Sequence, residues 1–126
     1  QFIDQFGPGP APTFVRAPGR VNLIGEHTDY NDGFVCPMAI EPHIAFAFRP
    51  RGDSLVRVRS TAASGETSFD LRASIKPTEP RDHWSNYVLG IASELAALGQ
   101  ANVGIDCLVH ATLPKGSGLS SSAAME

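Results

Sequence analysis

Runs of alternating apolar and polar residues, interrupted by glycine and proline, predict a chain built largely from short strands. Pro18-Gly19 is expected to end the first strand, and Glu41-Pro42 to separate the second from the third. Glu66–Leu71 is expected to form an edge strand. The six predicted strands are Thr13–Ala17, Phe34–Ile40, His43–Arg49, Ser54–Ser60, Glu66–Leu71 and Val103–Leu113.

Apolar residues spaced three and four apart predict one long helix, at His83–Leu98. Asp82 is its expected N-cap, and Gly99 is expected to stop it. Trp84 and Tyr87 are interpreted as core residues. The whole apolar stripe consists of Trp84, Tyr87, Val88, Ile91, Leu95 and Leu98.

Two further segments complete the expected architecture. Gln1–Gly7 is typical of the end of a helix, with Phe2 and Phe6 on one face and Gly7 as its stop. In Val103–Leu113 the odd-numbered residues point one way, which predicts a half-buried strand that packs on the long helix. The order of the elements predicts an α+β fold, in which helices cover one face of a mixed β-sheet.

Composition narrows the classes of function. The chain has 126 residues, of which 42% are hydrophobic and 18% are charged, and this suits one globular domain. Its net charge of -3 argues against a nucleic-acid-binding surface and against binding to anionic membranes. No apolar run reaches the ~20 residues of a membrane span, and no secretory leader is visible, so we expect a cytoplasmic protein.

Cysteine and histidine add no metal or redox motif. Cys36 and Cys107 lie far apart in apolar runs, and they are interpreted as buried free thiols, with a disulfide as the alternative. The four histidines are scattered without a His-x-x-x-His pair, so no zinc site is expected.

A turn rich in glycine and serine follows the last predicted strand. Gly116 and Gly118 allow the backbone to turn sharply and to approach a ligand closely. A strand, a glycine turn and a helix start direct backbone N–H groups toward one point, which suits phosphate. Linkers and helix caps share this composition, and the Gly-x-x-x-x-Gly-Lys-Ser/Thr motif is absent. Lys115 is interpreted as a solvated loop residue.

A cluster of polar residues lies in the loop after the first strand. Its carboxylates can accept hydrogen bonds from sugar hydroxyls. Arg20 can stabilise the charge of a phosphoryl group during transfer, or favour the alkoxide form of an attacking hydroxyl. The alternative is a structural loop, in which Arg20 pairs with a carboxylate and His27 is satisfied by backbone. The cluster consists of Arg20, Glu26, His27, Asp29 and Asn31.

Read together, these two segments resemble motifs of a known kinase family. Gly19–Asn31, with its Glu-His-Thr-Asp, resembles the galactokinase signature. Pro114–Ala123 is similar to the nucleotide loop of the wider GHMP family of galactokinase, homoserine, mevalonate and phosphomevalonate kinases. The resemblance extends over nearly the whole chain. Residues 1–126 would therefore form the N-terminal domain of such a kinase, with a fold like domain 2 of ribosomal protein S5.

The resemblance implies that ATP phosphorylates α-D-galactose to galactose 1-phosphate, as in the Leloir pathway. Arg20 would stabilise the transition state, and Ser122 would ligate Mg²⁺, with Ser121 as the second choice. The sugar would be bound by Glu26, His27, Thr28 and Asp29. The ATP phosphates would be wrapped by Gly116, Ser117, Gly118, Leu119, Ser120, Ser121 and Ser122.

The resemblance also implies parts that these 126 residues lack. In the family the catalytic aspartate, a second magnesium ligand and the C-terminal domain all follow the phosphate loop. The chain is therefore expected to be an N-terminal fragment without kinase activity of its own. An exposed apolar surface is expected where the missing domain would pack, so the fragment should self-associate. The full-length protein is expected to be a monomer or a weak dimer.

Two other functions share related motifs. A galactokinase-like sensor binds ATP and galactose without catalysis, but its Ser-Ser-Ala portion is shortened, whereas Ser121–Ala123 is complete here. In N-acetylgalactosamine kinase the signature departs after the histidine, whereas Thr28–Gly33 matches galactokinase. Both comparisons favour the galactose enzyme.

Overall fold

The computed structural model describes residues 1–25, 27–80, 83–114 and 117–126, apart from the side chain of Asp29. At its centre lies a five-stranded sheet in the order β1-β2-β5-β3-β4. β3 and β5 are parallel and the other neighbours are antiparallel, so the mixed sheet and the α+β class are confirmed. The elements are α1 (Phe2–Phe6), β1 (Thr13–Asn22), the 3-10 turn η1 (Asp29–Asn31), β2 (Pro37–Pro50), β3 (Leu55–Ser60), β4 (Glu66–Asp70), α2 (Ser85–Ala97), β5 (Ile105–Ala111) and α3 (Ser121–Met125).

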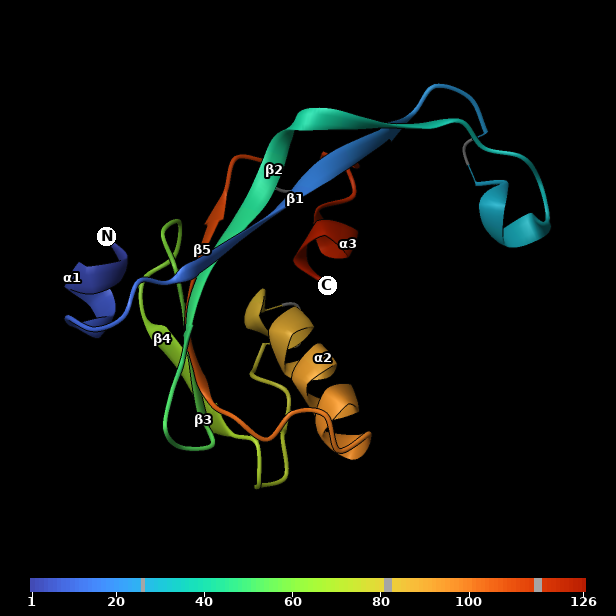
Figure 1. The fold of residues 1–126 in the computed structure, drawn as a ribbon. Helices are drawn as coiled ribbons and strands as arrows, with labels where there is room; N and C mark the ends of the chain where they lie inside the picture. Colours follow the sequence, from blue (N-terminus) through green and yellow to red (C-terminus); the bar gives the residue numbers. More distant parts are fainter. Residues whose placement is uncertain (26, 81–82, 115–116) are drawn as a thin grey trace.

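The main core lies between the sheet and the later helices. Ile44, Val58 and Val109 are among its most deeply buried side chains, and they come from three neighbouring strands. Figure 1 shows α2 and α3 on this face of the curved sheet, as expected, and α1 on the opposite side. None of the helices in the described ranges is long and apolar enough to cross a bilayer.

β5 is buried on both faces, so the expectation of a half-buried strand was wrong. Residues 106–109 are all buried. On the outer face, Leu108 packs with Ala47 and with Phe2 and Phe6 of α1. The alternation within one strand does not show what another segment covers, and α1 covers the face that the pattern assigned to solvent.

A buried carboxylate at the centre of this outer face gathers arginines from three places. In the sheet register, Asp106 lies between Arg49 on β2 and Arg57 on β3. Its Oδ1 accepts hydrogen bonds from Arg51 at 2.9 Å and from Arg57 at 2.8 Å, and its Oδ2 lies 3.5 Å from Arg49. Arg49 also donates to the carbonyl oxygen of Phe6 at 3.2 Å. The cluster therefore pairs a buried charge and ties α1 to the sheet.

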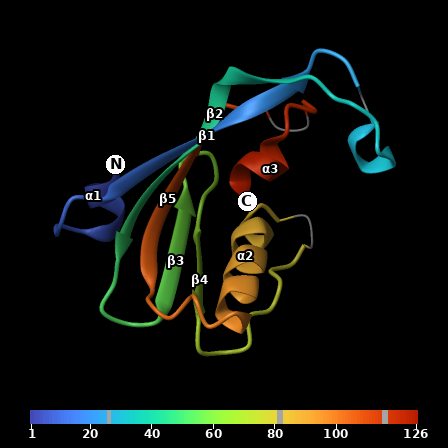
Figure 2. The same cartoon turned by 45° about the vertical axis from the view of Figure 1, so that its right-hand side comes forward.

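β1 and β2 form one long hairpin, and both strands continue through the dipeptides that were expected to interrupt them. The register shifts between Pro18 and Arg20, where one residue of β1 faces residues 40–42 of β2. Pro18 lies beside this irregularity in the edge strand β1, where proline is tolerated. Pro42 falls in residues 40–42, which have no partner in the β1 register, so its missing N–H costs no ladder bond. We call residues 20–39 the arm, because in Figures 1 and 2 they reach beyond the rest of the domain.

The arm carries exposed apolar side chains. Phe34 is 99% exposed and Ile24 is 74% exposed. The strand predicted from Phe34 begins only at Pro37, and Cys36 is exposed, so its assignment as a buried thiol was wrong. Cys107 is buried, as expected. The exposed residues agree with an apolar surface on this chain, whereas self-association stays a prediction.

α2 starts at Ser85, and Gly99 follows it with a left-handed φ of +70°, as expected for a helix stop. The expected N-cap, Asp82, lies outside the described residues. Trp84 packs against the main core, but Tyr87 is 38% exposed, so its core assignment was wrong. Val88, Ile91 and Leu95 of the stripe border an open apolar groove between α2, α3 and the sheet, whereas Leu98 is 70% exposed and lies outside it. The lining of the groove includes Val15, Phe46, Phe48, Ile91, Leu95 and Met125.

Candidate functional site

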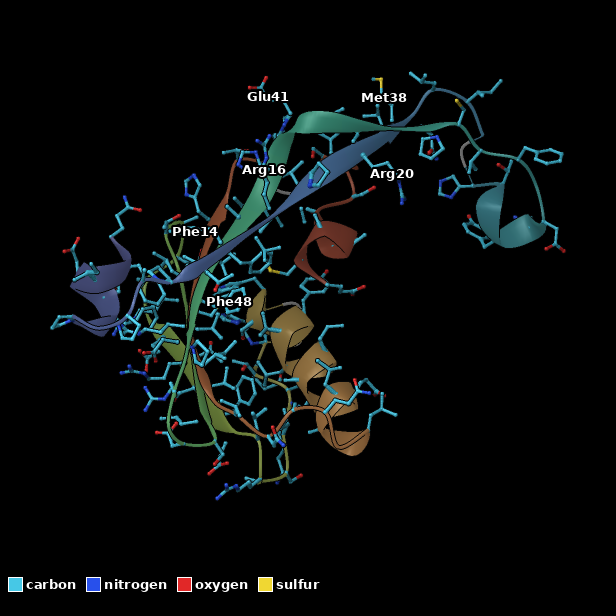
Figure 3. The ribbon with its side chains drawn as sticks, in the orientation of Figure 1. Phe14, Arg16, Arg20, Met38, Glu41 and Phe48 are labelled. Atoms are coloured by element: carbon cyan, nitrogen blue, oxygen red, sulfur yellow. The ribbon has the colours of Figure 1, made fainter. Side chains whose placement is uncertain are left out.

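The two segments singled out in the sequence meet where the register of β1 and β2 shifts, between Pro18 and Arg20. The backbone N–H of Arg20 donates a hydrogen bond to the carbonyl oxygen of Leu119, 3.2 Å away. The approach favours glycine at position 19, because a Cβ there would lie 3.0 Å from the Leu119 oxygen and would also meet the end of the Leu113 side chain. The Arg20 side chain is exposed, and Figure 3 shows it on the side of the arm toward α3. The structure thus brings the arginine of the polar cluster to the phosphate loop.

Thr28 organises the loop at the end of the arm. Its hydroxyl lies 2.9 Å from the carbonyl oxygen of Gly25 and 3.0 Å from that of Phe34, so it links the two sides of the loop. Because a hydroxyl has one proton, it donates to one carbonyl at a time. The Thr28 carbonyl oxygen in turn accepts the Gly33 N–H at 2.8 Å. These bonds favour a loop-shaping role for Thr28, and direct contact with sugar stays a prediction.

His27 is held by a side chain and not by backbone, contrary to the structural alternative. Its Nδ1 shares a 2.6 Å hydrogen bond with the hydroxyl of Tyr30, and the two rings meet edge to face. The backbone of His27 is left-handed, with a φ of +58°, and its carbonyl oxygen accepts a bond from Asn31 at 3.0 Å. The imidazole therefore has a defined orientation.

The carboxylates of the polar cluster are the two sugar candidates whose side chains the structure does not describe. Glu26 lies outside the described residues, and of Asp29 only the backbone is described, in η1. The pairing of Arg20 with either carboxylate therefore stays an alternative. Figure 1 places η1 at the outer end of the arm, away from α2, whereas the backbone of Arg20 bonds to Leu119.

The described part of the predicted phosphate loop, residues 117–122, contains two residues with a left-handed backbone. Gly118 and Ser120 have φ values of +71° and +61°, and Ser120 is the N-cap of α3. Left-handed residues in such turns direct N–H groups into a concave surface that favours anions. The hydroxyl of Ser117 donates to the Pro114 carbonyl oxygen at 2.8 Å, which closes the start of the turn. Lys115 and Gly116 lie outside the described residues.

The start of α3 offers hydroxyl oxygens to a magnesium ion. Ser122 is exposed there, and its Oγ lies 2.9 Å from the hydroxyl of Tyr87 on α2. In the described part of the chain no three His, Cys, Asp or Glu side chains gather as a metal site. Nucleotide-bound Mg²⁺ needs few protein oxygens, because phosphates and water supply the rest. A single serine hydroxyl beside a phosphate loop fits that donor set.

The sequence analysis did not identify two tyrosines that contact candidate site residues, Tyr30 beside His27 and Tyr87 beside Ser122. Tyr30 lies three residues after His27, a spacing at which side chains meet within one helical turn, so the contact could have been expected. Tyr87 matched the apolar stripe of its helix and was therefore assigned to the core. Its contact with Ser122 joins segments far apart in the sequence, and no local pattern predicts it.

Two family models match the chain. The galactokinase galactose-binding signature matches residues 1–50, and the N-terminal domain of GHMP kinases matches residues 86–126. The galactokinase of Chloroflexus aurantiacus is 48% identical over 124 residues, and that of Chloroflexus aggregans is 51% identical over 119 residues. These alignments cover 98% and 94% of this chain, but only 31% and 30% of the two relatives.

Solved structures of kinases match the fold of this chain as well. A Lactococcus lactis galactokinase complexed with galactose matches with a TM-score of 0.90 and 38% identity, over 99% of this chain and 32% of that one. The Methanococcus jannaschii mevalonate kinase matches with a TM-score of 0.73 at 21% identity, over 94% of this chain and 38% of that one, which shows a shared fold. The chain thus spans about a third of the length of its galactokinase relatives. From its two motifs, the two family models and these relatives, we conclude that the chain belongs to the galactokinase family, within the GHMP kinases.

Proposed function

We propose that the protein transfers the γ-phosphoryl group of ATP to the anomeric hydroxyl of α-D-galactose, giving galactose 1-phosphate and ADP. One observation carries the proposal: the 3.2 Å hydrogen bond from the Arg20 N–H to the Leu119 carbonyl oxygen. It holds the arginine of the sugar signature against the phosphate loop. The lactococcal relative, described as a complex with galactose, supports this choice of sugar. A cytoplasmic location, and a monomer or weak dimer, belong to the same proposal.

The loop at the end of the arm would bind the hexose. Glu26 and Asp29 would accept hydrogen bonds from sugar hydroxyls, each worth about 1.5–3 kcal/mol as a charge-assisted bond. His27 would contribute Nε2, because its Nδ1 is engaged by Tyr30. Thr28 would hold the loop in shape through its bonds to the two sides of the loop.

The phosphates would lie in the turn formed by Gly116, Ser117, Gly118, Leu119, Ser120, Ser121 and Ser122. Backbone N–H groups in this turn would face the phosphate oxygens. Ser122, or Ser121 as second choice, would ligate Mg²⁺, which when bound supplies neutralising charge to the phosphates. The guanidinium of Arg20 would stabilise the charge that develops on the transferred group. The attacking hydroxyl would lose its proton to an aspartate that follows the phosphate loop in the family.

A coupled assay of ADP release tests this proposal on the full-length protein. ATP and Mg²⁺ are supplied with galactose, N-acetylgalactosamine or mevalonate in parallel. We expect ADP release that depends on galactose, together with loss of reducing sugar, because phosphorylation at the anomeric oxygen blocks the reducing end. The absence of galactose-dependent release would refute the proposal, and a preference for N-acetylgalactosamine would reassign the substrate.

Arg20→Ala provides the matched variant. Removing one preorganised group that stabilises transition-state charge typically lowers kcat by about 10²–10³. The melting temperature should stay close to that of the wild type, because the side chain is exposed and its backbone N–H makes the bond to Leu119. An unchanged kcat would remove Arg20 from the proposed chemistry.

A further inference from the structure

One hydrogen bond connects α2 to the start of α3. The hydroxyl of Tyr87 lies 2.9 Å from Oγ of Ser122, across 35 positions of sequence. Both groups lie on the surface, since Tyr87 is 38% exposed and Ser122 is exposed. The contact therefore fills no core, and it places a phenol beside the hydroxyl that we propose as the magnesium ligand.

The turn that presents Tyr87 is firmly anchored. Asn86 accepts the N–H of Thr78 at 2.7 Å through Oδ1 and donates to the Thr78 carbonyl oxygen at 2.9 Å. Ser85 is fully buried, with its hydroxyl 2.8 Å from Nδ1 of His83. Trp84 packs against the main core. The three residues that precede Tyr87 are therefore held by hydrogen bonds or by core packing, so the hydroxyl of Tyr87 projects from a stable position.

Ser122, by contrast, has little else to fix its side chain. It lies in the first turn of a five-residue helix that is anchored by the buried Ala124. A serine side chain has three staggered rotamers, and an exposed one can populate several of them. A hydrogen bond to a fixed partner selects one rotamer, so Tyr87 decides where the oxygen of Ser122 lies.

We propose that Tyr87 is a positioning residue, whose hydroxyl oxygen accepts a hydrogen bond from the Ser122 hydroxyl and leaves the lone pairs of Ser122 Oγ free for Mg²⁺. A hydroxyl carries one proton and two lone pairs, and a metal ion takes a lone pair. When Ser122 donates this hydrogen bond and Tyr87 accepts it, no donor occupies the lone pairs of Ser122 Oγ, so a metal ion can bind there. This inference rests on the proposed function, because it requires Ser122 to ligate the magnesium of bound nucleotide.

The test uses the full-length protein and a non-hydrolysable ATP analogue. Its Kd is measured by calorimetry for the wild type and for Tyr87→Phe, once with Mg²⁺ and once with EDTA. Tyr87→Phe keeps the ring and removes only the oxygen. We expect it to raise Kd about three- to tenfold with Mg²⁺, which corresponds to one rotamer choice and one net hydrogen bond, and to leave Kd in EDTA unchanged.

A double-mutant cycle gives the control. In a Ser122→Ala background Tyr87→Phe should add no further loss, whereas in a Ser121→Ala background it should keep its full effect. Equal losses with Mg²⁺ and with EDTA would overturn the inference, since Tyr87 would then contact the nucleotide itself or support the fold. Additive losses in the Ser122→Ala background would overturn it as well.

Failure of this inference and failure of the proposed function remain distinguishable. If the wild type phosphorylates galactose and binds nucleotide more tightly with Mg²⁺, while Tyr87→Phe behaves like the wild type, only the role of Tyr87 is wrong. If the wild type itself shows neither property, the proposed function fails, and the role of Tyr87 fails with it.

Discussion

Asp106 on β5 and Arg57 on β3 are register partners in the one parallel pair of strands in the described sheet, and their side chains form a 2.8 Å hydrogen bond on its outer face. The Asp106 side chain is only 5% exposed. A buried charge costs several kcal/mol unless it is paired. This contact and those from Arg49 and Arg51 offset that cost, so they allow β5 to pair with its neighbours while Asp106 is buried.

Asp106→Ala should destabilise the fold strongly. It leaves three arginines gathered around a site without a counter-charge, and breaking a buried pair in this way costs about 3–5 kcal/mol. The free energy of unfolding from urea denaturation would show the loss. Asp53→Ala is the control, because that side chain is 52% exposed and should have a far smaller effect. Equal losses for the two variants would contradict the central role of Asp106.

The same cluster predicts how stability depends on pH. Burial by itself would raise the pKa of Asp106, but hydrogen bonds from Arg51 and Arg57 outweigh it and hold that pKa below its ordinary value. The hydrogen bond from Arg51 lowers the pKa of Asp53 to about 2. Both carboxyls thus bind protons more weakly in the folded chain than in the unfolded one.

The stability from these carboxylates is therefore complete above the unfolded pKa, which is 3.8 for aspartate, and is lost as pH falls toward 2. Urea denaturation at pH 7, 5, 4 and 3 should show a constant contribution from this pair between pH 7 and 5, and then a steep decline. The Asp53→Asn/Asp106→Asn double variant should decline less steeply. If the free energy of unfolding fell equally steeply in the wild type and in the double variant, other groups would control acid unfolding.

Thr28→Val should loosen the loop at the end of the arm without unfolding the domain. The variant keeps the shape of the side chain but removes the hydroxyl that links Gly25 and Phe34. One net hydrogen bond is worth about 1 kcal/mol, so the amide of Gly33 should exchange its hydrogen about fivefold faster. Thr28→Ser retains the hydroxyl and should exchange nearly as slowly as the wild type. An unchanged rate in Thr28→Val would count against the loop-shaping role.

Asp29→Ala in the full-length protein should weaken galactose binding far more than ATP binding. The loss of one charge-assisted hydrogen bond, about 1.5–3 kcal/mol, corresponds to a rise of about ten- to a hundredfold in the Kd for galactose. Calorimetry with each ligand separately gives both values. Asp32→Asn is the matched control, because Asp32 is exposed at the end of the same turn and asparagine tolerates its left-handed backbone. Similar losses for both ligands would contradict the sugar role of Asp29.

The two cysteines should differ sharply toward a thiol reagent. Burial raises the pKa of the Cys107 thiol to about 12, so almost none of it is thiolate at pH 8, whereas Cys36 is exposed. Brief alkylation of the native protein, followed by peptide mapping, should modify Cys36 and spare Cys107. Denaturant should make both react. Fast modification of Cys107 in the native state would mean that the sheet opens readily.

Strand positions were largely visible in the sequence, because each run of alternation is a local property. The alternation around Val56 and Val58 matched β3, and the helical repeat matched α2 to within two residues at its start. The sequence analysis expected strand breaks at two proline dipeptides through which the strands continue. Pro18 and Pro42 looked like strand ends, yet the sheet tolerates both, because Pro18 lies in an edge strand and Pro42 lies among the residues of β2 that have no partner on β1. Which backbone N–H groups a sheet needs depends on the neighbouring strand.

The sequence by itself determined the family, through Gly19–Asn31 and the serine-rich turn, since these motifs rest on residue types at fixed local spacing. Only the tertiary structure decided which groups meet. It joined Arg20 to Leu119, set Tyr87 beside Ser122, and placed Asp106 among arginines from different segments. Such contacts arise from strand order and helix packing, which bring distant residues within hydrogen-bonding distance, and local patterning carries no record of those distances.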